Sequence, residues 1–447
     1  MSRFFSILSL ATMALASACE NADVAGAPDP NPNTQLNLNP TSDKPDGPHE
    51  LLDETQCPAP AALPPLTASP LPTEALIVHE WGTFTSLQGS DGVTLDGMHH
   101  EDERLPSFVH QIAVAGGSTM QSKGAGPLPA EVNQKMETPV LYFHTSKAHS
   151  VEAAVSFPKG VITQWFPDVA SRNPKFNSVY EIANGQMTWQ LQVDPLLSMK
   201  KAPAVAADSI WQPSRNVVAT PVKVGNEIEG FVFYRGLGNF TLPLKVTSAD
   251  GKLTVHNDSA QAIPGAVILH ANADGRGHAR ALGPIPAGGT VTLAEPNVQC
   301  SDYVDTARVL LHKALVDTGL YDDEARAMID TWTHSYFKTP GLRLLYILPP
   351  QWTDELLPLS ITPTPAQTLR ILVGRIEILT QQEEKSTIAR IQTLQGQKEV
   401  LHVDVLREEG RFFEAKVRRA LGQISDTAML KFSHDLLDVM DKEDVVH

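Results

Sequence analysis

The chain has 447 residues, with 35 Lys and Arg against 51 Asp and Glu, which gives a formal net charge of −16. Hydrophobic residues make up 42% and charged residues 19%, a composition that is typical of a globular protein and excludes a polytopic membrane protein. The negative charge argues against nucleic acid as a partner, because nucleic-acid binding needs a basic face. The 34 prolines and 29 glycines predict many turns and few long helices.

Residues 1–18 have the three-part layout of a signal peptide: a basic start, an apolar run over 4–11, and small residues directly before Cys19. An apolar run of this length is too short to span a bilayer, so the segment predicts export. Its end resembles a bacterial lipobox, in which the signal is cut before a cysteine whose thiol receives diacylglycerol, although Ala16 stands where leucine is usual. The run 16–18 also fits ordinary signal cleavage, so simple secretion is the alternative to a lipid anchor on Cys19.

Residues 19–75 are rich in proline and poor in basic and aromatic residues. Such a stretch buries too little apolar area to offset its ordering entropy, which predicts a disordered tether between the anchor and a folded body. Glu20, not aspartate, follows the anchor cysteine, so we expect an outer-membrane location, periplasmic or surface-facing. The other two cysteines, Cys57 and Cys300, predict one disulfide in an oxidising compartment, with two buried free thiols as the alternative.

Short apolar runs with period-two alternation, separated by turn residues, predict a β-rich body over residues 76–300. We expect 151–157 and 161–166 to pair as a hairpin, and 245–295 to form a small β-sandwich. After residue 300 apolar residues recur at helical spacing, which predicts an α-rich region over 301–447. Its few expected strands are 342–348 and 369–379, and a capping box at Thr380 and Glu383 predicts a helix after the second of them. The expected fold class is therefore mainly β, antiparallel and sandwich-like, with an α-rich C-terminal part.

The strong catalytic signatures are missing from the sequence. It has neither a phosphate-binding G-x-x-x-x-G-K-[ST] loop nor a G-x-S-x-G nucleophile elbow. His79 and Glu80 begin like the zinc motif H-E-x-x-H, but Thr83 follows where the second histidine is required, and the segment is a predicted strand. There is thus no motif that assigns a reaction.

Weak candidates remain among polar residues inside apolar strands. His79 and Glu80 are neighbours on a strand, so their side chains point to opposite faces. A buried Glu80 needs a cation, which Arg215 or Arg235 could supply in a structural ion pair. The alternative roles for Glu80 are metal ligand and general base.

A second predicted strand carries Glu137 near its start and His144 at its end. Tyr142 and His144 share a face of this strand. If the strand pairs with the first one, these side chains and His79 could line a metal or acid–base pocket.

The densest group of potential metal ligands lies in a predicted loop and includes His99, His100 and Glu101. Adjacent residues can converge in a loop, so a divalent cation could bind there. The alternative is a solvated, acidic surface loop.

Several phrases occur together along the chain: 79–85 (HEWGTFT), 136–143 (METPVLYF), 157–163 (FPKGVIT), 233–240 (FYRGLGNF), 319–332 and 341–349. As a set they resemble a family of uncharacterised exported bacterial proteins, over about residues 76–380. The resemblance implies an exported protein with these phrases as its framework, and it implies no reaction.

The anchor, the tether and the lack of catalytic motifs favour a lipid-anchored envelope protein that acts as a binding or structural module at the cell surface. The expected partners are the membrane, through the anchor, and a polysaccharide or protein; we expect no nucleic acid and no cofactor. The alternative is a secreted metal-dependent hydrolase acting on envelope or environmental polymers, with His79, Glu137, His144 and the loop histidines at its site. The sequence leaves both classes open.

Overall fold

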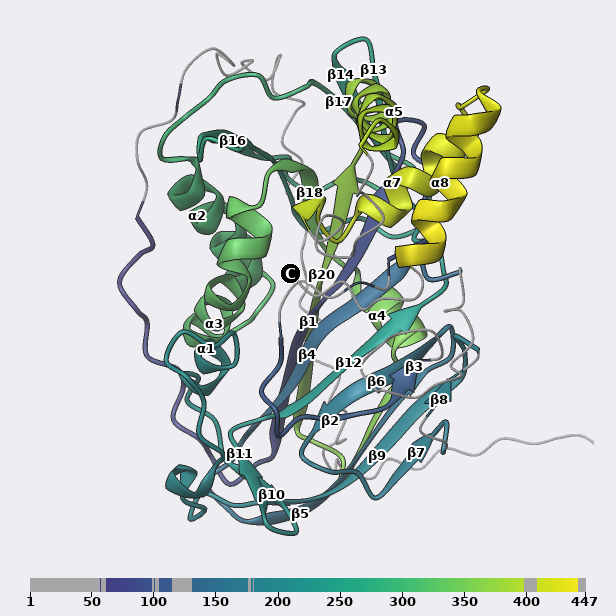
Figure 1. The fold of residues 1–447 in the computed structure, drawn as a ribbon. Coiled ribbons are helices and arrows are strands. Elements are labelled where there is room, and N and C mark those ends of the chain that lie inside the picture. Colours follow the sequence, from purple (N-terminus) through teal and green to yellow (C-terminus); the bar gives the residue numbers. More distant parts are fainter. Residues whose placement is uncertain are drawn as a thin grey trace, which may run out of the picture. The chain divides into compact units, whose positions relative to one another are not determined.

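The fold comes from a computed structural model of the chain (Figure 1). It describes residues 57, 62–98, 100, 104–114, 131–175, 178–179, 181–397 and 408–440. All of these belong to one compact unit that spans residues 53–447. The unit over residues 1–52, which includes the predicted signal peptide and Cys19, lies outside the described residues.

A nine-stranded sheet forms the centre of the described body. Its strands, in spatial order, are β16 (Gly277–Ala281), β15 (Ala266–Ala271), β18 (Gly341–Ile347), β20 (Gln367–Ile378), β1 (Ile77–Gln88), β4 (Gln134–His144), β12 (Val232–Gly238), β6 (Gly160–Phe166) and β2 (His110–Gln111). β1 and β20 pair in parallel, whereas the other neighbours are antiparallel. β1 and β4 are buried on both faces, so their sequences do not alternate between apolar and polar residues, and several polar side chains are buried within them.

The predicted strands at 342–348 and 369–379 correspond to β18 and β20. Both lie inside the nine-stranded sheet, beside β15 and β1. The predicted β-rich and α-rich parts of the chain therefore share one sheet. The expected fold class is confirmed: the described body is mainly β with antiparallel sheets, and its longer helices come from the C-terminal part.

A second sheet packs over one face of the first. Its strands are β11 (Glu227–Glu229), β10 (Val222–Val224), β9 (Gly185–Val193), β5 (His149–Phe157) and β19 (Leu359–Thr362), with β7 (Ser171–Asn173) paired to β9. One hydrophobic core joins the two sheets; within it the rings of Trp189 and Tyr234 lie 6.1 Å apart between centroids. Alternate residues of β9 are exposed, so this sheet presents its other face to solvent.

The hairpin predicted for 151–157 and 161–166 is wrong. β5 pairs with β9 and β19 in the second sheet, whereas β6 pairs with β12 and β2 in the central sheet. The tight turn between them carries the chain from one sheet to the other. The turn residues in the sequence cannot distinguish a hairpin within one sheet from a connection between two sheets, because the chain reverses its direction in both.

The region 245–295 also differs from the predicted sandwich. A separate three-stranded sheet contains β13 (Leu244–Ala249), β14 (Lys252–Asn257) and β17 (Thr290–Ala294). β15 and β16, which lie between β14 and β17 in the chain, join the central sheet instead. A short parallel pair, β3 (Ala113–Val114) and β8 (Ser178–Val179), completes the described strands.

Helices cover the other face of the central sheet and one end of the body (Figure 1). The helical elements are η1 (Met199–Lys201), α1 (Gln212–Arg215), α2 (Tyr303–Asp317), α3 (Asp322–Trp332), η2 (Thr333–Lys338), α4 (Pro350–Leu356), α5 (Gln381–Gln395), α7 (Phe413–Leu421) and α8 (Thr427–Met440). A second core, which includes Trp81 and Trp332, joins α2 and α3 to the sheet. At the start of α5 the Thr380 hydroxyl accepts a hydrogen bond from the Glu383 N–H at 3.1 Å, which confirms the predicted capping box.

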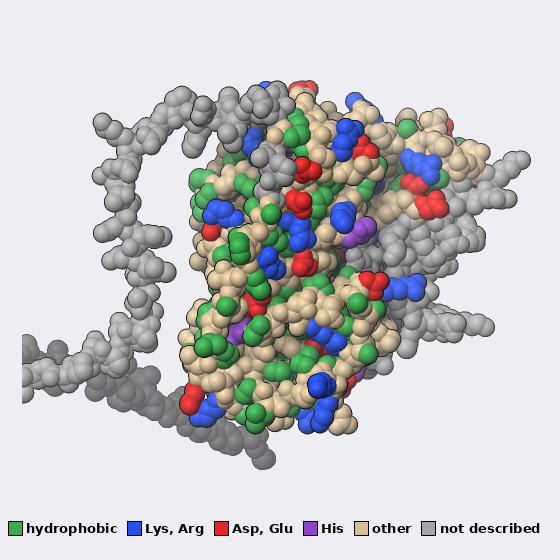
Figure 2. All heavy atoms as spheres, turned by 90° about the vertical axis from the view of Figure 1, so that its left-hand side faces the viewer, with side chains coloured by type: hydrophobic (Ala, Val, Ile, Leu, Met, Phe, Trp, Pro, Cys, Tyr) green, Lys and Arg blue, Asp and Glu red, His purple; other side chains and the backbone are tan. Residues whose placement is uncertain are grey.

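Each helix in the described part of the chain is too short or too polar to cross a lipid bilayer. Figure 2 shows the face of the body that carries α2 and α3. Lys and Arg side chains are interspersed there with Asp, Glu and hydrophobic side chains. This face therefore has no field of a single sign of the kind that nucleic acid requires.

A bulge in β4 decides which side chains reach the helical face of the sheet. The register between β1 and β4 shifts by one residue at Thr138, which has a positive φ of 52°. Pro139 packs there so closely that a Cβ on Gly82 would lie 2.8 Å from the Pro139 Cα, so only glycine fits opposite the bulge. Residues an odd number of positions apart normally point to opposite faces of a strand. Because the bulge adds one residue, Glu137 and His144 point to the same face.

Candidate functional site

Three polar side chains meet between the central sheet and α3. β1 and β4 pair with Ile77 opposite His144 and His79 opposite Tyr142, which makes the two histidines diagonal neighbours on one face. Glu324 reaches them from the first turn of α3. Its carboxylate oxygens lie 2.9 and 3.1 Å from His79 Nδ1, and Oε1 lies 3.0 Å from His144 Nε2. We call these three residues the histidine–glutamate centre.

The helix itself orients Glu324. Tyr321 precedes α3, and its backbone N–H donates a hydrogen bond to Glu324 Oε2 at 3.0 Å, the usual role of an acidic residue in a first helical turn. Burial raises the pKa of Glu324, but the hydrogen bonds from His144 and His79 and the electrostatic interactions with both rings together lower it more, so the net pKa lies below its ordinary value. The carboxylate is therefore ionised at neutral pH.

The centre is closed off from solvent. His79 and Glu324 are 0% exposed and His144 is 4% exposed. The Tyr321 ring covers both imidazoles, with its centroid 4.5 Å from that of His79 and 5.1 Å from that of His144. His79 Nε2 is buried and has no hydrogen-bond partner among the described residues. Nitrogen and oxygen donors in this arrangement can share protons or bind a metal ion.

Glu80 points to the opposite face, as the strand alternation predicts. Its Oε2 lies 2.6 Å from Arg370 Nε, and its Oε1 accepts a hydrogen bond from the Tyr234 hydroxyl. The expected partners were wrong. Arg215 pairs with Glu229 instead, and Arg370 reaches Glu80 because it lies directly opposite in the parallel ladder between β1 and β20.

Arg370 holds two carboxylates. Besides Glu80 it binds Asp354 on α4, with Nη1 2.9 Å from Oδ1. Burial lowers the pKa of the guanidinium, but Glu80, Tyr234 and Asp354 together raise it above its ordinary value, so Arg370 stays charged. Its Nη2 atom is buried and has no hydrogen-bond partner among the described residues. One donor of this cation is thus still available.

Arg370 also forms part of the lining of a groove with a volume of about 620 Å³. The groove lies among α4, β19 and the first residues of β20, and Thr368, Leu369 and Arg370 form part of its wall. Its lining includes prolines, aliphatic residues, threonines and a serine, together with Asp354, and no Phe, Tyr or Trp among the described residues. We call it the Arg370 groove.

Two strand edges border the Arg370 groove. β18 pairs with β20 only as far as Ile347 opposite Val373, after which the Leu348 N–H donates to the Leu372 carbonyl at 2.8 Å. Because backbone groups alternate in direction along a strand, Arg370 and Thr368 present theirs to the same side as Leu372. On that side of Thr368 and Arg370, no strand lies beside β20 in the described part of the chain. β19 is likewise an edge strand, paired only with β5.

Glu137 belongs to a different cluster from His79. Arg411, from the segment before α7, lies 2.5 Å from Glu137 Oε1, and the Thr85 hydroxyl donates to Oε2 at 2.5 Å. Burial raises the pKa of Glu137, but the charges of Arg411, Lys135 and other buried arginines, Arg235 among them, lower it to about 2. Glu137 and Arg235 are thus parts of a buried ionic network, not of the histidine–glutamate centre.

His100 is not on the surface, contrary to the acidic-loop alternative. It is 4% exposed, and its Nε2 lies 2.8 Å from Glu414 Oε2 on α7. His99 and Glu101 lie outside the described residues. Tyr142, which we expected beside His79, donates its hydroxyl to the Ser214 carbonyl at 3.0 Å and so takes no part in the centre.

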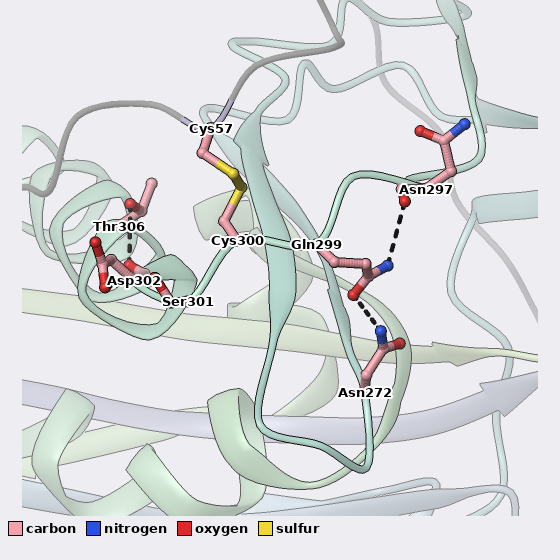
Figure 3. Close-up of a disulfide and its surroundings, with 8 residues drawn as sticks. All are labelled: Cys57, Asn272, Asn297, Gln299, Cys300, Ser301, Asp302 and Thr306. Carbon is pink, nitrogen blue, oxygen red and sulfur yellow. Dashed lines mark hydrogen bonds between the residues drawn. A yellow bond between two sulfur atoms is a disulfide. The ribbon is translucent and has the colours of Figure 1, made fainter.

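The structure places Cys57 and Cys300 in a disulfide (Figure 3), with their Cα atoms 5.5 Å apart. Cys300 is held by backbone hydrogen bonds to Gly277 on β16, and it lies three residues before the first residue of α2. The bond therefore joins the N-terminal segment to the start of the helical layer.

Sequence reasoning brought His79 and His144 together but missed Glu324 and Arg370. Glu324 is one of three acidic residues in the first turn of α3, a pattern that ordinary helix starts share. For Arg370 the pattern was a cation at the entrance to a buried strand. Neither pattern predicts which residue the side chain contacts, because contacts between residues hundreds of positions apart depend on the order of strands in the sheet.

No known protein-family model matches the chain, and no curated protein matches it. Among solved structures, the Fcho1 mu homology domain of Danio rerio with bound Eps15 peptide has a TM-score of 0.28 and 9% identity, covering 69% of this chain and 98% of that chain. The yeast delta-COP-I mu-homology domain has a TM-score of 0.24 and 8% identity, covering 69% and 98%. Similarity at this level carries no argument about the fold or function of this chain.

Proposed function

We propose that this chain is an exported, lipid-anchored protein of the cell envelope whose folded body binds an extended peptide segment of a partner protein in the Arg370 groove. The signal-like residues 1–18, Cys19 and the proline-rich tether support the anchor and an outer-membrane location. The groove supports the binding role. Export and binding are separate parts of the proposal and are tested separately.

The observation that carries the binding role is the open edge of β20. Proteins usually cover or interrupt a long unpaired strand edge, because it invites pairing with another chain. Here the backbone groups of Thr368 and Arg370 face a groove that is large enough for a chain segment. An extended peptide that added itself as a strand would satisfy them, which is a common mode of peptide recognition.

The Arg370 side chain adds a second recognition element. Its Nη2 donor is buried without an acceptor, and an unmade hydrogen bond of a buried charged group costs about 1–3 kcal/mol or more. A peptide carbonyl or carboxylate oxygen in the groove would supply the acceptor. Because Glu80 and Asp354 already balance the charge of Arg370, the occupant does not need to be strongly acidic.

The groove favours a peptide over a polysaccharide. Sugar rings bind proteins largely by stacking on aromatic faces, and the groove lining in the described part of the chain contains none. The hydrolase alternative also has less support. Glu137 does not meet His79, and the histidine–glutamate centre is buried, so a polymer has no access to it in this conformation.

The test is selection of binders from a random-peptide phage library on the purified mature protein, followed by affinity measurements on two variants. Thr368 is exposed, so Thr368→Pro removes one edge N–H while leaving the core intact, since proline is tolerated on strand edges. Thr368→Ala changes the same side chain and keeps the N–H. We expect selected peptides to bind Thr368→Pro at least about tenfold more weakly than wild type, a loss of about 1.4 kcal/mol, and to bind Thr368→Ala normally. Failure to select any peptide, or equal binding to both variants, would contradict the proposal.

A further inference from the structure

We propose that His79, His144 and Glu324 bind one divalent transition-metal ion of the zinc class. The protein ligands would be His79 Nδ1, His144 Nε2 and the Glu324 carboxylate. This site is distinct from the Arg370 groove, so the proposal does not rest on peptide binding and goes beyond it.

The ligand atoms already have the spacing of a coordination shell. All three lie within 4.8 Å of one another, and the closest nitrogen–oxygen distances are 2.9 and 3.0 Å. Metal–ligand bonds of about 2.0–2.2 Å at tetrahedral angles place neighbouring ligand atoms roughly 3.3 Å apart. Each of these two nitrogen–oxygen pairs would open by a few tenths of an ångström to admit the ion.

The donor types indicate which ions fit. Two imidazole nitrogens together with one carboxylate form a donor set that suits zinc and its neighbours, whereas calcium and magnesium prefer all-oxygen sites. Neither a cysteine nor a methionine belongs to the centre, which disfavours monovalent copper. The three protein ligands leave a fourth tetrahedral position for a solvent molecule.

The surroundings hold the ligands in place. The two histidines come from paired strands, β1 and β4, whose register is fixed by burial on both faces. The Tyr321 N–H fixes one oxygen of the Glu324 carboxylate at 3.0 Å, the kind of outer contact that usually orients a metal ligand. The ligands therefore need little rearrangement, which reduces the entropic cost of binding.

A metal-free explanation competes with this one. The same distances fit two neutral imidazoles that each donate an N–H to a shared carboxylate. His79 Nε2 is buried without a partner among the described residues in either case, because the atom that faces Glu324 is Nδ1. The two explanations differ in whether the folded protein retains an ion.

The first measurement uses the wild-type mature protein alone. After treatment with a chelator and its removal, we expect the protein to take up one zinc ion per chain from ZnCl₂. With CoCl₂ we expect the visible absorption bands of four-coordinate cobalt(II) with nitrogen and oxygen ligands. Substoichiometric zinc and no such bands in a protein that is folded by circular dichroism would overturn the proposal.

The second measurement compares variants by zinc titration calorimetry. Glu324→Gln keeps the size of the side chain and an oxygen that can accept from Tyr321, but it removes the ligand charge. His144→Ala removes one ligand. We expect each to weaken zinc binding by at least about tenfold to a hundredfold, because even changes outside the ligand shell have effects of this size.

His110→Ala is the matched control, because His110 forms a histidine–carboxylate pair with Glu227 at 2.8 Å to which the described residues add no third ligand. It should bind zinc like wild type. Wild-type affinity in Glu324→Gln would place any bound ion elsewhere and overturn the proposal. If the variants of the centre do not fold, the zinc content and cobalt spectrum of the wild type still decide the question.

Discussion

His79 Nδ1 lies 2.9 Å from Glu324 Oε2, although the two residues are 245 positions apart in the chain. His144 contacts the same carboxylate from 180 positions away. Through this one side chain the first turn of α3 is joined to two central strands, β1 and β4. The contact therefore fastens the helical layer to the sheet, whether or not an ion is bound.

Loss of Glu324 should destabilise the fold strongly. Glu324→Ala leaves two buried imidazoles without their acceptor, and each buried donor that loses its acceptor costs about 1–3 kcal/mol. The measurement is the free energy of unfolding in urea at pH 7, with a chelator present so that metal binding does not contribute. As a control, Asp317→Ala breaks an exposed pair with Lys313 and should have a much smaller effect. Similar losses for the two variants would show that the buried centre has no special role in stability.

Glu137 should make the fold sensitive to acid. Its pKa is lowered from 4.5 to about 2 in the folded protein, so its stabilising contribution is complete above the unfolded value and is lost as the pH falls toward the folded value. The contribution is on the order of 3 kcal/mol. Unfolding free energies of wild type and Glu137→Gln should therefore differ at pH 7 and converge as the pH falls from about 5 to about 2. A difference that does not change with pH would contradict this assignment.

The sequence predicted those elements whose signal is local. The strand that contains His79 and Glu80 and the capping box at Thr380 both reflect interactions within a few residues, and both are present. The opposite directions of His79 and Glu80 also follow from strand geometry alone. These features needed no knowledge of which strands are neighbours.

The remainder depended on strand order and on one bulge. Arg370 reaches Glu80 only because β20, the last strand of the sheet in the chain, lies parallel to β1, the first. Glu324 reaches His79 because α3 covers that particular face. The extra residue at Thr138 changes which side chains of β4 share a face, and no alternation pattern in the sequence shows it. Sequence patterns therefore predict which side chains are buried and which face of a strand they occupy, but not which distant residues they contact.

The pairing of Cys57 and Cys300 is open to direct chemical test. In the Cys19→Ala protein, which keeps only these two cysteines, alkylation under denaturing conditions should label neither thiol without a reductant and both after reduction. Because the bond closes a loop of 243 residues, a Cys57→Ser, Cys300→Ser double variant should lose up to about 5 kcal/mol of stability in the chain-entropy model. Labelling of both thiols without reductant would mean that they are free.

Substitution of Cys19 tests the proposed lipid anchor. Cys19→Ala should release the protein from the membrane fraction and prevent incorporation of radiolabelled palmitate, because the thiol that would carry the lipid is gone and each buried acyl methylene contributes about 0.8 kcal/mol to membrane binding. Cys57→Ala is the matched control and should stay in the membrane fraction. Unchanged fractionation of Cys19→Ala would exclude a lipid anchor at this residue.

Hydrogen–deuterium exchange of the mature protein, with and without a selected peptide, tests the open edge of β20 most directly. If the peptide adds a strand there, the backbone N–H groups of Thr368 and Arg370 become hydrogen-bonded, and exchange over residues 367–371 should slow markedly while the exposed outer residues of β9 are unchanged. Binding of the peptide with unaltered exchange over residues 367–371 would contradict the account.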